Sequence, residues 1–168
     1  MMGVRLQALL APRSGEQLLE VGAGNGLYAL EVAHALLPSG GIDMVDDQPR
    51  MLDAAVRRAR ERGLYNITAV FADVRFLPFE DGRFDSAYMI ASLGHVTDPD
   101  ATLIEIARVL VSSGRVVVGE LHDDPHMLGP ARLRTLAASA GFRLARRETA
   151  SCGYLAELVS PGGRDVAA

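Results

Sequence analysis

Residues 18–26 read LLEVGAGNG, and this segment constrains the fold of the chain more than any other. An apolar strand carries an acid near its end, Glu20, and glycines then follow at every second position: Gly22, Gly24 and Gly26. Glycines at this spacing let the backbone turn sharply and approach a ligand that a Cβ atom would exclude. The helix that follows offers unpaired N–H groups and a partial positive charge at its N-terminus. The segment therefore predicts a strand, a ligand-binding loop and a helix.

Strand and helix patterns alternate along the rest of the chain. We expect helices at 4–10, 27–37, 49–62, 98–110 and 131–140, and strands at 17–21, 42–45, 67–71, 85–90, 115–119, 142–148 and 154–160. Repeated β–α units predict an α/β fold, with a doubly wound, mostly parallel sheet and helices on both faces. The last two strands are expected to close as an antiparallel hairpin, which makes seven strands in all. We expect one domain over 1–160 and a disordered tail at 161–168.

Composition excludes several classes of function. The chain has 168 residues and a net charge of −4, and no run of lysine or arginine resembles a nucleic-acid footprint. The apolar runs are too short to span a bilayer, and residues 1–10 lack the features of a signal peptide. The single cysteine, Cys152, excludes an intramolecular disulfide and disfavours a thiolate metal cluster. We expect a cytoplasmic protein with no nucleic-acid partner, no membrane span and no metal.

Acids follow the second and third predicted strands. In a nucleoside-binding site, a carboxylate at Asp46 can accept hydrogen bonds from both ribose hydroxyls. The alternative is that Asp46 caps the helix that begins at Pro49. Asp73 can accept a hydrogen bond from the exocyclic amine of adenine, or it can be a solvated loop acid. After the fourth strand, Ala91 and Ser92 are small enough to leave room for a ligand and a substrate.

The glycine spacing separates two families of cofactor-binding proteins. A dinucleotide fingerprint is G-x-G-x-x-G, whereas the third glycine here comes one residue early. Five segments in order, EVGAGNG, VDDQPRML, FADV, RFDSA and RVLVSSGRVVV, resemble the pattern of class I S-adenosylmethionine (SAM)-dependent methyltransferases. The nearest branch is the UbiE-like group, which modifies quinones, sterols and other small molecules. The resemblance covers roughly residues 17–120.

This resemblance implies a Rossmann-like fold, SAM as cofactor and S-adenosylhomocysteine (SAH) as product. The expected reaction transfers a methyl group to an oxygen, nitrogen or carbon atom of a small-molecule acceptor. The resemblance also implies SAM contacts from the glycine loop and from the ends of the next three strands. These contacts are Glu20, Gly22, Ala23, Gly24, Asn25, Gly26, Asp46, Asp47, Met51, Asp73, Val74, Ala91 and Ser92.

An acceptor oxygen or nitrogen can require a base to remove its proton, and two places in the chain offer candidates. His95 follows the fourth strand and is the first candidate, although it can equally be a structural histidine. The second is the segment ELHDDPH at 120–126, where we select His122. Histidine and aspartate also bind metals, but Pro125 removes any regular helical spacing. A solvated loop is the third interpretation of this segment.

Few residues precede the first strand, so the chain predicts only a minimal N-terminal lid. The site is then open, or a second subunit closes it as a homodimer or a partner protein, or the acceptor is large. Two alternatives to methyl transfer keep SAM: a non-catalytic scaffold subunit and a cyclase on the same fold. A nicotinamide-dependent dehydrogenase is disfavoured by the glycine spacing. Fold alone does not specify the acceptor.

Overall fold

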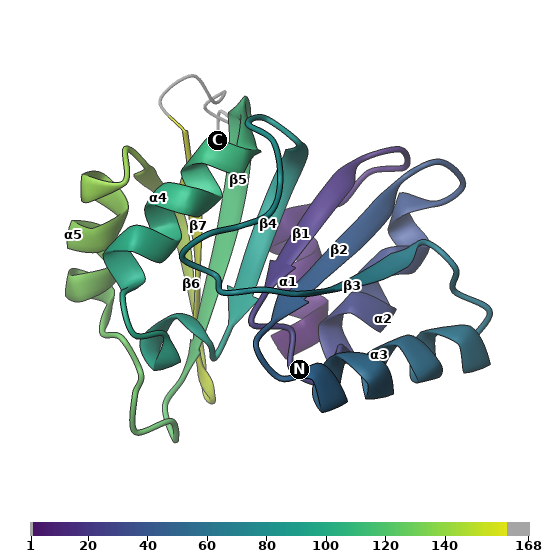
Figure 1. Ribbon diagram of the computed structural model, residues 1–168. Coiled ribbons are helices and arrows are strands. Elements are labelled where there is room, and N and C mark those ends of the chain that lie inside the picture. The colour runs from purple at the N-terminus through teal and green to yellow at the C-terminus, as the bar shows by residue number, and fades with distance from the viewer. Residues whose placement is uncertain (1, 161–168) are drawn as a thin grey trace.

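The computed structural model describes residues 2–160, which form a seven-stranded sheet in the order β3-β2-β1-β4-β5-β7-β6 (Figure 1). The strands are β1 (Gln17–Val21), β2 (Gly41–Asp46), β3 (Ile67–Phe71), β4 (Phe84–Ile90), β5 (Leu110–Leu121), β6 (Arg143–Ala150) and β7 (Gly153–Val159). The first five strands run parallel, and β7 pairs antiparallel with both β5 and β6. The predicted sheet and its C-terminal hairpin are confirmed. The predicted tail at 161–168 lies outside the described residues.

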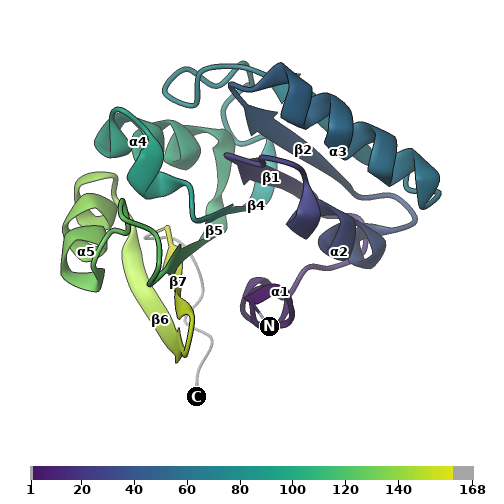
Figure 2. The same ribbon diagram turned by 90° about the horizontal axis from the view of Figure 1, so that it is seen from below.

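Helices cover both faces of this sheet, as predicted. They are α1 (Met2–Leu10), α2 (Leu27–Leu36), α3 (Pro49–Glu61), α4 (Pro99–Val109) and α5 (Pro130–Ser139), with a short 3₁₀ turn, η1, at Leu93–His95. One core lies under α1, α2 and α3, and a second lies under α4 and α5 on the opposite face (Figure 2). Leu18 and Leu19, neighbours on β1, belong to different cores because successive side chains of a strand point to opposite faces. Within residues 2–160, no helix is both long and apolar enough to cross a membrane.

The start of β5 differs from the prediction. The sequence placed a turn at 112–114 and the strand at 115–119, whereas β5 begins at Leu110, directly after α4. Its pairing with β4 jumps from Leu110 opposite Phe84 to Arg115 opposite Ser86, so the intervening residues bulge out of the ladder. The expected turn is therefore present as an irregularity inside one long strand. The preceding helix, α4, agrees with the predicted range 98–110, and the Asp98 carboxylate caps it by accepting a hydrogen bond from the N–H of Ala101 at 3.0 Å.

The N-terminal helix α1 packs against the sheet. Its Leu6 and Leu10 are fully buried, and the helix contacts α2, β5 and β7. Arg115 of β5 holds the end of α1, because its guanidinium donates to the carbonyl of Leu10 at 2.7 Å and pairs with Glu16 at 2.9 Å. The helix therefore belongs to the core and does not line the cleft at the strand ends.

Candidate active site

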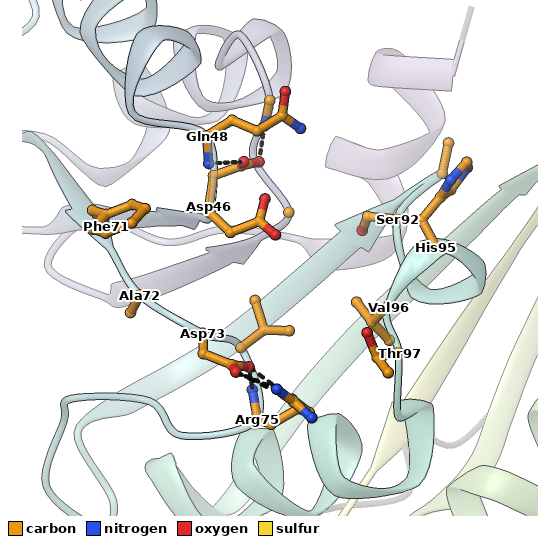
Figure 3. Close-up of a pocket in the computed structure, with 15 residues that line it drawn as sticks. Asp46, Gln48, Phe71, Ala72, Asp73, Arg75, Ser92, His95, Val96 and Thr97 are labelled. Carbon is orange, nitrogen blue, oxygen red and sulfur yellow. Dashed lines mark hydrogen bonds and ion pairs between the residues drawn. The ribbon is translucent and has the colours of Figure 1, made fainter.

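A cleft of about 540 Å³ opens at the carboxyl ends of the parallel strands. The strand order reverses between β1 and β4, and ligands of doubly wound sheets bind where this reversal leaves a crevice. In Figure 3, Asp46 and Gln48 lie above Asp73 and Arg75, and the segment from Ser92 to Thr97 forms the opposite wall. The sequence-predicted residues that line this cleft are Gly22, Gly24, Asp46, Asp47, Asp73, Val74, Ala91, Ser92 and His95.

Glycine is required at the three positions of the loop after β1 for different structural reasons. All have a positive φ, +71° at Gly22, +52° at Gly24 and +71° at Gly26, a conformation that costs other residues about 1–2 kcal/mol. A Cβ atom on Gly22 would lie 2.5 Å from the Cβ of Ser92, and one on Gly26 would lie 2.6 Å from the Cβ of Ala55. A Cβ on Gly24 would meet nothing within 4 Å. Gly24 is therefore the glycine that presents bare backbone to the open cleft.

Asp46 joins the glycine loop to the start of α3. Its carboxylate is buried and accepts hydrogen bonds from the N–H of Gly24 at 2.7 Å and the N–H of Gln48 at 2.9 Å. Each carboxylate oxygen can accept two hydrogen bonds, and each receives one here from the backbone. The side chain is thus fixed at the edge of the cleft and keeps acceptor capacity for ligand hydroxyls. The alternative role as a cap of α3 is not borne out, because its hydrogen bond goes to Gln48, before the first residue of the helix, and no side chain of residues 2–160 caps the helix start.

Asp73 forms a fork of two parallel hydrogen bonds with Arg75, a residue that was not predicted from the sequence. The Arg75 guanidinium donates to both oxygens of Asp73, with Nη2 at 2.6 Å and Nε at 3.0 Å from its nearest oxygens. These hydrogen bonds hold the pKa of Asp73 below its usual range. Arg75 and the exposed ring of Phe71 also line the cleft. The only feature of the sequence that could have indicated Phe71 and Arg75 is their position close to Asp73, the predicted adenine-binding acid.

A strained turn ends β4 at the floor of the cleft. Ala91 has a φ of +49°, which is uncommon for a residue with a side chain and occurs most often at functional sites. Its N–H bonds to the carbonyl of Gly119 at 2.8 Å, so the turn is fastened to β5. Ser92 follows and donates to the carbonyl of Val21 at 3.1 Å, directly beside Gly22. The small side chains predicted here therefore meet the glycine loop.

Glu20, on β1, is a predicted cofactor contact that does not line the cleft. It is 3% exposed, pairs with Tyr88 across β1 and β4, and has one oxygen, Oε2, with no hydrogen-bond partner among the described residues. Burial raises the pKa of Glu20 to about 8, the Tyr88 hydroxyl opposes this rise, and the charge of Asp46 adds to it. The other predicted contacts that do not line the cleft are Ala23, Asn25, Gly26 and Met51.

The two histidine candidates occupy different positions. His95 lines the cleft in η1, and its Nε2 atom lies 2.7 Å from an oxygen of Asp124, in the loop after β5. The His126 ring lies 4.6 Å from the His95 ring, centroid to centroid. His122 is exposed, and its side chain does not line the cleft. Because β4 and β5 are neighbours in the sheet, their loops bring together residues that the sequence presented as separate candidates.

A buried acid, Glu120, lies at the end of β5 and was not singled out by the sequence as a separate site. Its side chain is 1% exposed, accepts a hydrogen bond from the N–H of Leu128 at 3.2 Å, and leaves Oε1 without a partner in the described part of the chain. Burial raises the pKa of Glu120 to about 7. The Tyr154 hydroxyl donates to the carbonyl of Leu128 at 2.5 Å, so this buried group helps to fix the loop that carries Asp124 and His126.

Known proteins share both the sequence pattern and the fold. Residues 18–114 match the family model described as a methyltransferase domain. The O-methyltransferase resE of Aspergillus sclerotiorum is 34% identical over 127 residues, which are 75% of this chain and 47% of the relative. The ubiquinone/menaquinone biosynthesis C-methyltransferase UbiE of Shewanella sp. (strain ANA-3) is 32% identical over 117 residues, 69% of this chain and 47% of the relative. The chain spans about half the length of these curated relatives.

Solved structures agree on the fold. A SAM-dependent methyltransferase from Aquifex aeolicus superposes with a TM-score of 0.87 at 18% identity, covering 94% of this chain and 88% of that one. The cyclase SpnF superposes with a TM-score of 0.86 at 22% identity, covering 95% of this chain and 80% of that one. The family model covers more than half of the chain and includes the glycine loop, Asp46 and Asp73. The chain therefore belongs to the class I SAM-dependent methyltransferases, a family whose cofactor is SAM.

Proposed function

We propose that this chain transfers the methyl group of SAM to an oxygen, nitrogen or carbon atom of a small-molecule acceptor and releases SAH. The observation that supports this most directly is the Asp46 carboxylate, which is fixed by two backbone N–H groups beside the open face of Gly24. This arrangement suits a ligand that carries ribose hydroxyls next to a group that must approach bare backbone. The curated relatives resE and UbiE, named as an O-methyltransferase and a C-methyltransferase, support a small-molecule acceptor.

Three groups of residues in the cleft would each bind a different part of the cofactor. The glycine loop would hold the methionine portion, Asp46 would accept from the ribose hydroxyls, and Asp73 with Phe71 would bind adenine. Asp73 remains able to accept from the adenine amine, because carboxylate oxygens have two acceptor positions each. Arg75 would then orient Asp73 for that contact, since the fork between them fixes the plane of the carboxylate.

The cofactor supplies an electrophilic methyl group when it is bound, so the chain contributes mainly positioning. His95 would lie on the acceptor side, because it lines the cleft in the turn that follows Ala91 and Ser92. With Nε2 bonded to Asp124, the Nδ1 atom of a neutral His95 is left to accept a proton. His95 thus stays the preferred candidate for a base, and His122 has the weaker position.

Cover for the acceptor would come from outside residues 2–160. The cleft is lined by strand ends and loops, and α1, which precedes the first strand, is packed into the core instead. A second copy of this chain or a partner subunit would close the site, or a large acceptor would cover it by itself.

Turnover of SAM tests the proposal. The purified chain would be incubated with SAM and a panel of phenols, quinols and amines, and SAH and acceptor masses would be followed by mass spectrometry. We expect SAH to appear together with an acceptor that has gained one methyl group, and we expect the Asp46→Ala variant to lose both.

The same assay separates the alternatives. Conversion of an acceptor without a change of mass and without SAH would indicate a cyclase. The fold shared with SpnF is compatible with this outcome but does not favour it, because the likeness is at 22% identity. SAM binding with no SAH from any acceptor, alone or with added partners, would indicate a scaffold subunit. Either result would contradict methyl transfer.

A further inference from the structure

Three side chains lie close together beside the cleft, and one of them, His95, lines it. His95 comes from η1 after β4, and Asp124 and His126 come from the loop after β5. One ligating atom from each lies within 4.8 Å of the others. The carboxylate of Asp124 lies close to both rings: His95 Nε2 is 2.7 Å from one oxygen, and His126 Nδ1 is 3.7 Å from the other.

These distances are close to those of a coordination sphere. Ligands held about 2.0–2.2 Å from a tetrahedral zinc ion lie roughly 3.3–3.5 Å from one another. The separations of 2.7 Å and 3.7 Å fall on either side of that value. The two separations are measured to different oxygens of Asp124, and one ligating atom from each residue lies within 4.8 Å of the others, so rotation of the exposed imidazoles would bring the three groups onto one ion.

The backbone holds the two loops together independently of these side chains. A Cβ atom on Gly94 would lie 1.9 Å from the carbonyl oxygen of His126, so the loops touch where only a glycine fits. Asp124 is fixed within its own loop, because one of its oxygens accepts the N–H of His126 at 2.8 Å. Its N–H in turn bonds to the carbonyl of Leu121 at 3.2 Å. The convergence is therefore a property of the fold.

The chemistry of the donor set indicates the kind of ion. Two imidazoles and one carboxylate suit Zn²⁺, Co²⁺, Ni²⁺ and Fe²⁺, whereas Mg²⁺ and Ca²⁺ favour oxygen ligands throughout. Among the described residues, Asp124 forms its salt bridges with these two histidines. The side chains of His95 and His126 are 48% and 59% exposed, so a bound ion would keep positions open to water or to an acceptor.

We propose that His95, Asp124 and His126 bind a divalent transition-metal ion of the zinc class at the acceptor end of the cleft. From the sequence alone no metal was expected, because Pro125 removes any regular spacing from the segment at 120–126. The third ligand, His95, lies in a different loop, and the spacing within that segment cannot reveal it. The role of the ion rests on the proposed function: it would select acceptors with a phenol- or enol-type oxygen. An acceptor hydroxyl bound to the ion would lose its proton to solvent more readily, and His95 would then act as a ligand instead of a base.

Cobalt binding tests this site without any assay of activity. The full chain would be stripped with a chelator and titrated with Co²⁺ while the visible absorption of the metal is recorded, and Zn²⁺ would then be added in competition. We expect one equivalent of Co²⁺ to bind and to be displaced by Zn²⁺. Loss of an outer-shell partner alone weakens metal binding by about 10–100-fold, so His126→Ala and Asp124→Asn should weaken it by at least about tenfold.

His122→Ala is the matched control, because His122 is an exposed histidine of the same loop that lies outside the cluster. We expect this variant to bind Co²⁺ as the wild type does. An equal loss of Co²⁺ affinity in His122→Ala and His126→Ala, or no stoichiometric binding of Co²⁺ by the wild type, would overturn the metal site. A parallel titration of each metal-free variant with SAM shows that it is folded. Normal SAM binding by a wild type that takes up no Co²⁺ would overturn the metal site and leave the proposed methyl transfer standing.

Discussion

At the residue scale, two buried acids near the glycine loop, Asp46 and Glu20, have opposite surroundings. Asp46 receives a backbone N–H on each oxygen, which satisfies its charge. Glu20 has an unpartnered oxygen, and burial raises its pKa to about 8. The pattern of the sequence presented both as contacts of one cofactor. It could not separate them, because the difference depends on which acid the folded strands cover.

The Glu20 carboxyl makes stability depend on pH. Its pKa is about 8 in the folded chain against an ordinary value of 4.5. Between these values the folded state keeps a proton that the unfolded state has lost, so stability falls as pH rises through this window. The Glu20→Gln variant stays neutral, and we expect it to gain stability over the wild type steadily from about pH 5 to pH 8. Urea unfolding of the SAM-free proteins at several pH values measures this, and parallel curves for the two proteins would rule it out.

Gly24 and Gly26 are expected to differ when each is replaced by alanine. Both substitutions meet the strain of a positive φ, about 1–2 kcal/mol. At Gly26 the new methyl group would also lie 2.6 Å from Ala55 and 3.1 Å from the sulfur of Met44, whereas at Gly24 it would enter the cleft. Gly26→Ala should therefore lower the melting temperature much more, and Gly24→Ala should mainly weaken SAM binding. Thermal melts and SAM titrations of both variants test this prediction. Equal melting temperatures for the two variants would contradict the different roles given to Gly24 and Gly26.

At the element scale, the connection from β3 to β4 has no helix, and residues 72–83 cross the sheet as a loop (Figure 1). Arg108 of α4 fastens this loop by donating to the carbonyls of Leu77 at 3.0 Å and Phe79 at 2.8 Å. Glu105 accepts from the N–H of Leu77 at 2.9 Å and also pairs with Arg108. Because the loop begins with Asp73 and Arg75, α4 helps to shape the part of the cleft that these two residues line.

Removal of this anchor should loosen the loop. We expect Arg108→Ala to increase amide hydrogen exchange over residues 76–82 and to weaken SAM binding several-fold, because the loop loses its bonds to α4. Arg132→Ala is the control, since Arg132 makes a longer and more exposed pair with Asp100 at 3.8 Å. Exchange that is unchanged in Arg108→Ala, or raised equally in Arg132→Ala, would show that Arg108 does not hold the loop.

The order of elements could be predicted because periodicity and turn residues define each one locally. Asp98 at the start of α4 is an example. Aspartate is a favoured capping residue just before a helical pattern, and the Asp98 side chain does cap this helix. The start of β5 could not be predicted, because the bulge after Leu110 depends on pairing with β4. Local patterns define elements, whereas registers and bulges depend on which strands become neighbours.

At the scale of the whole molecule, the site is built where distant segments meet. The positions of the glycine loop, Asp46 and Asp73 at the cleft could be predicted, because each follows a recognisable strand. The approach of His95 to Asp124 and the fork of Arg75 on Asp73 could not, since they arise from the sheet order and from side-chain geometry. The open cleft is also a property of the assembled fold, because α1 is used to cover β5 and β7.

A calorimetric titration with SAM, SAH and NADH tests the central claim most directly. We expect the wild type to bind SAM and SAH with dissociation constants on the order of 10⁻⁶ M and not to bind NADH. Asp46→Ala should weaken SAM binding by roughly 1–3 kcal/mol, which is the cost of leaving buried polar groups unpaired. Asp53→Ala, a change of an exposed acid on α3, should leave it unaltered. Tight NADH binding without SAM binding, or SAM binding indifferent to Asp46, would contradict this account of the site.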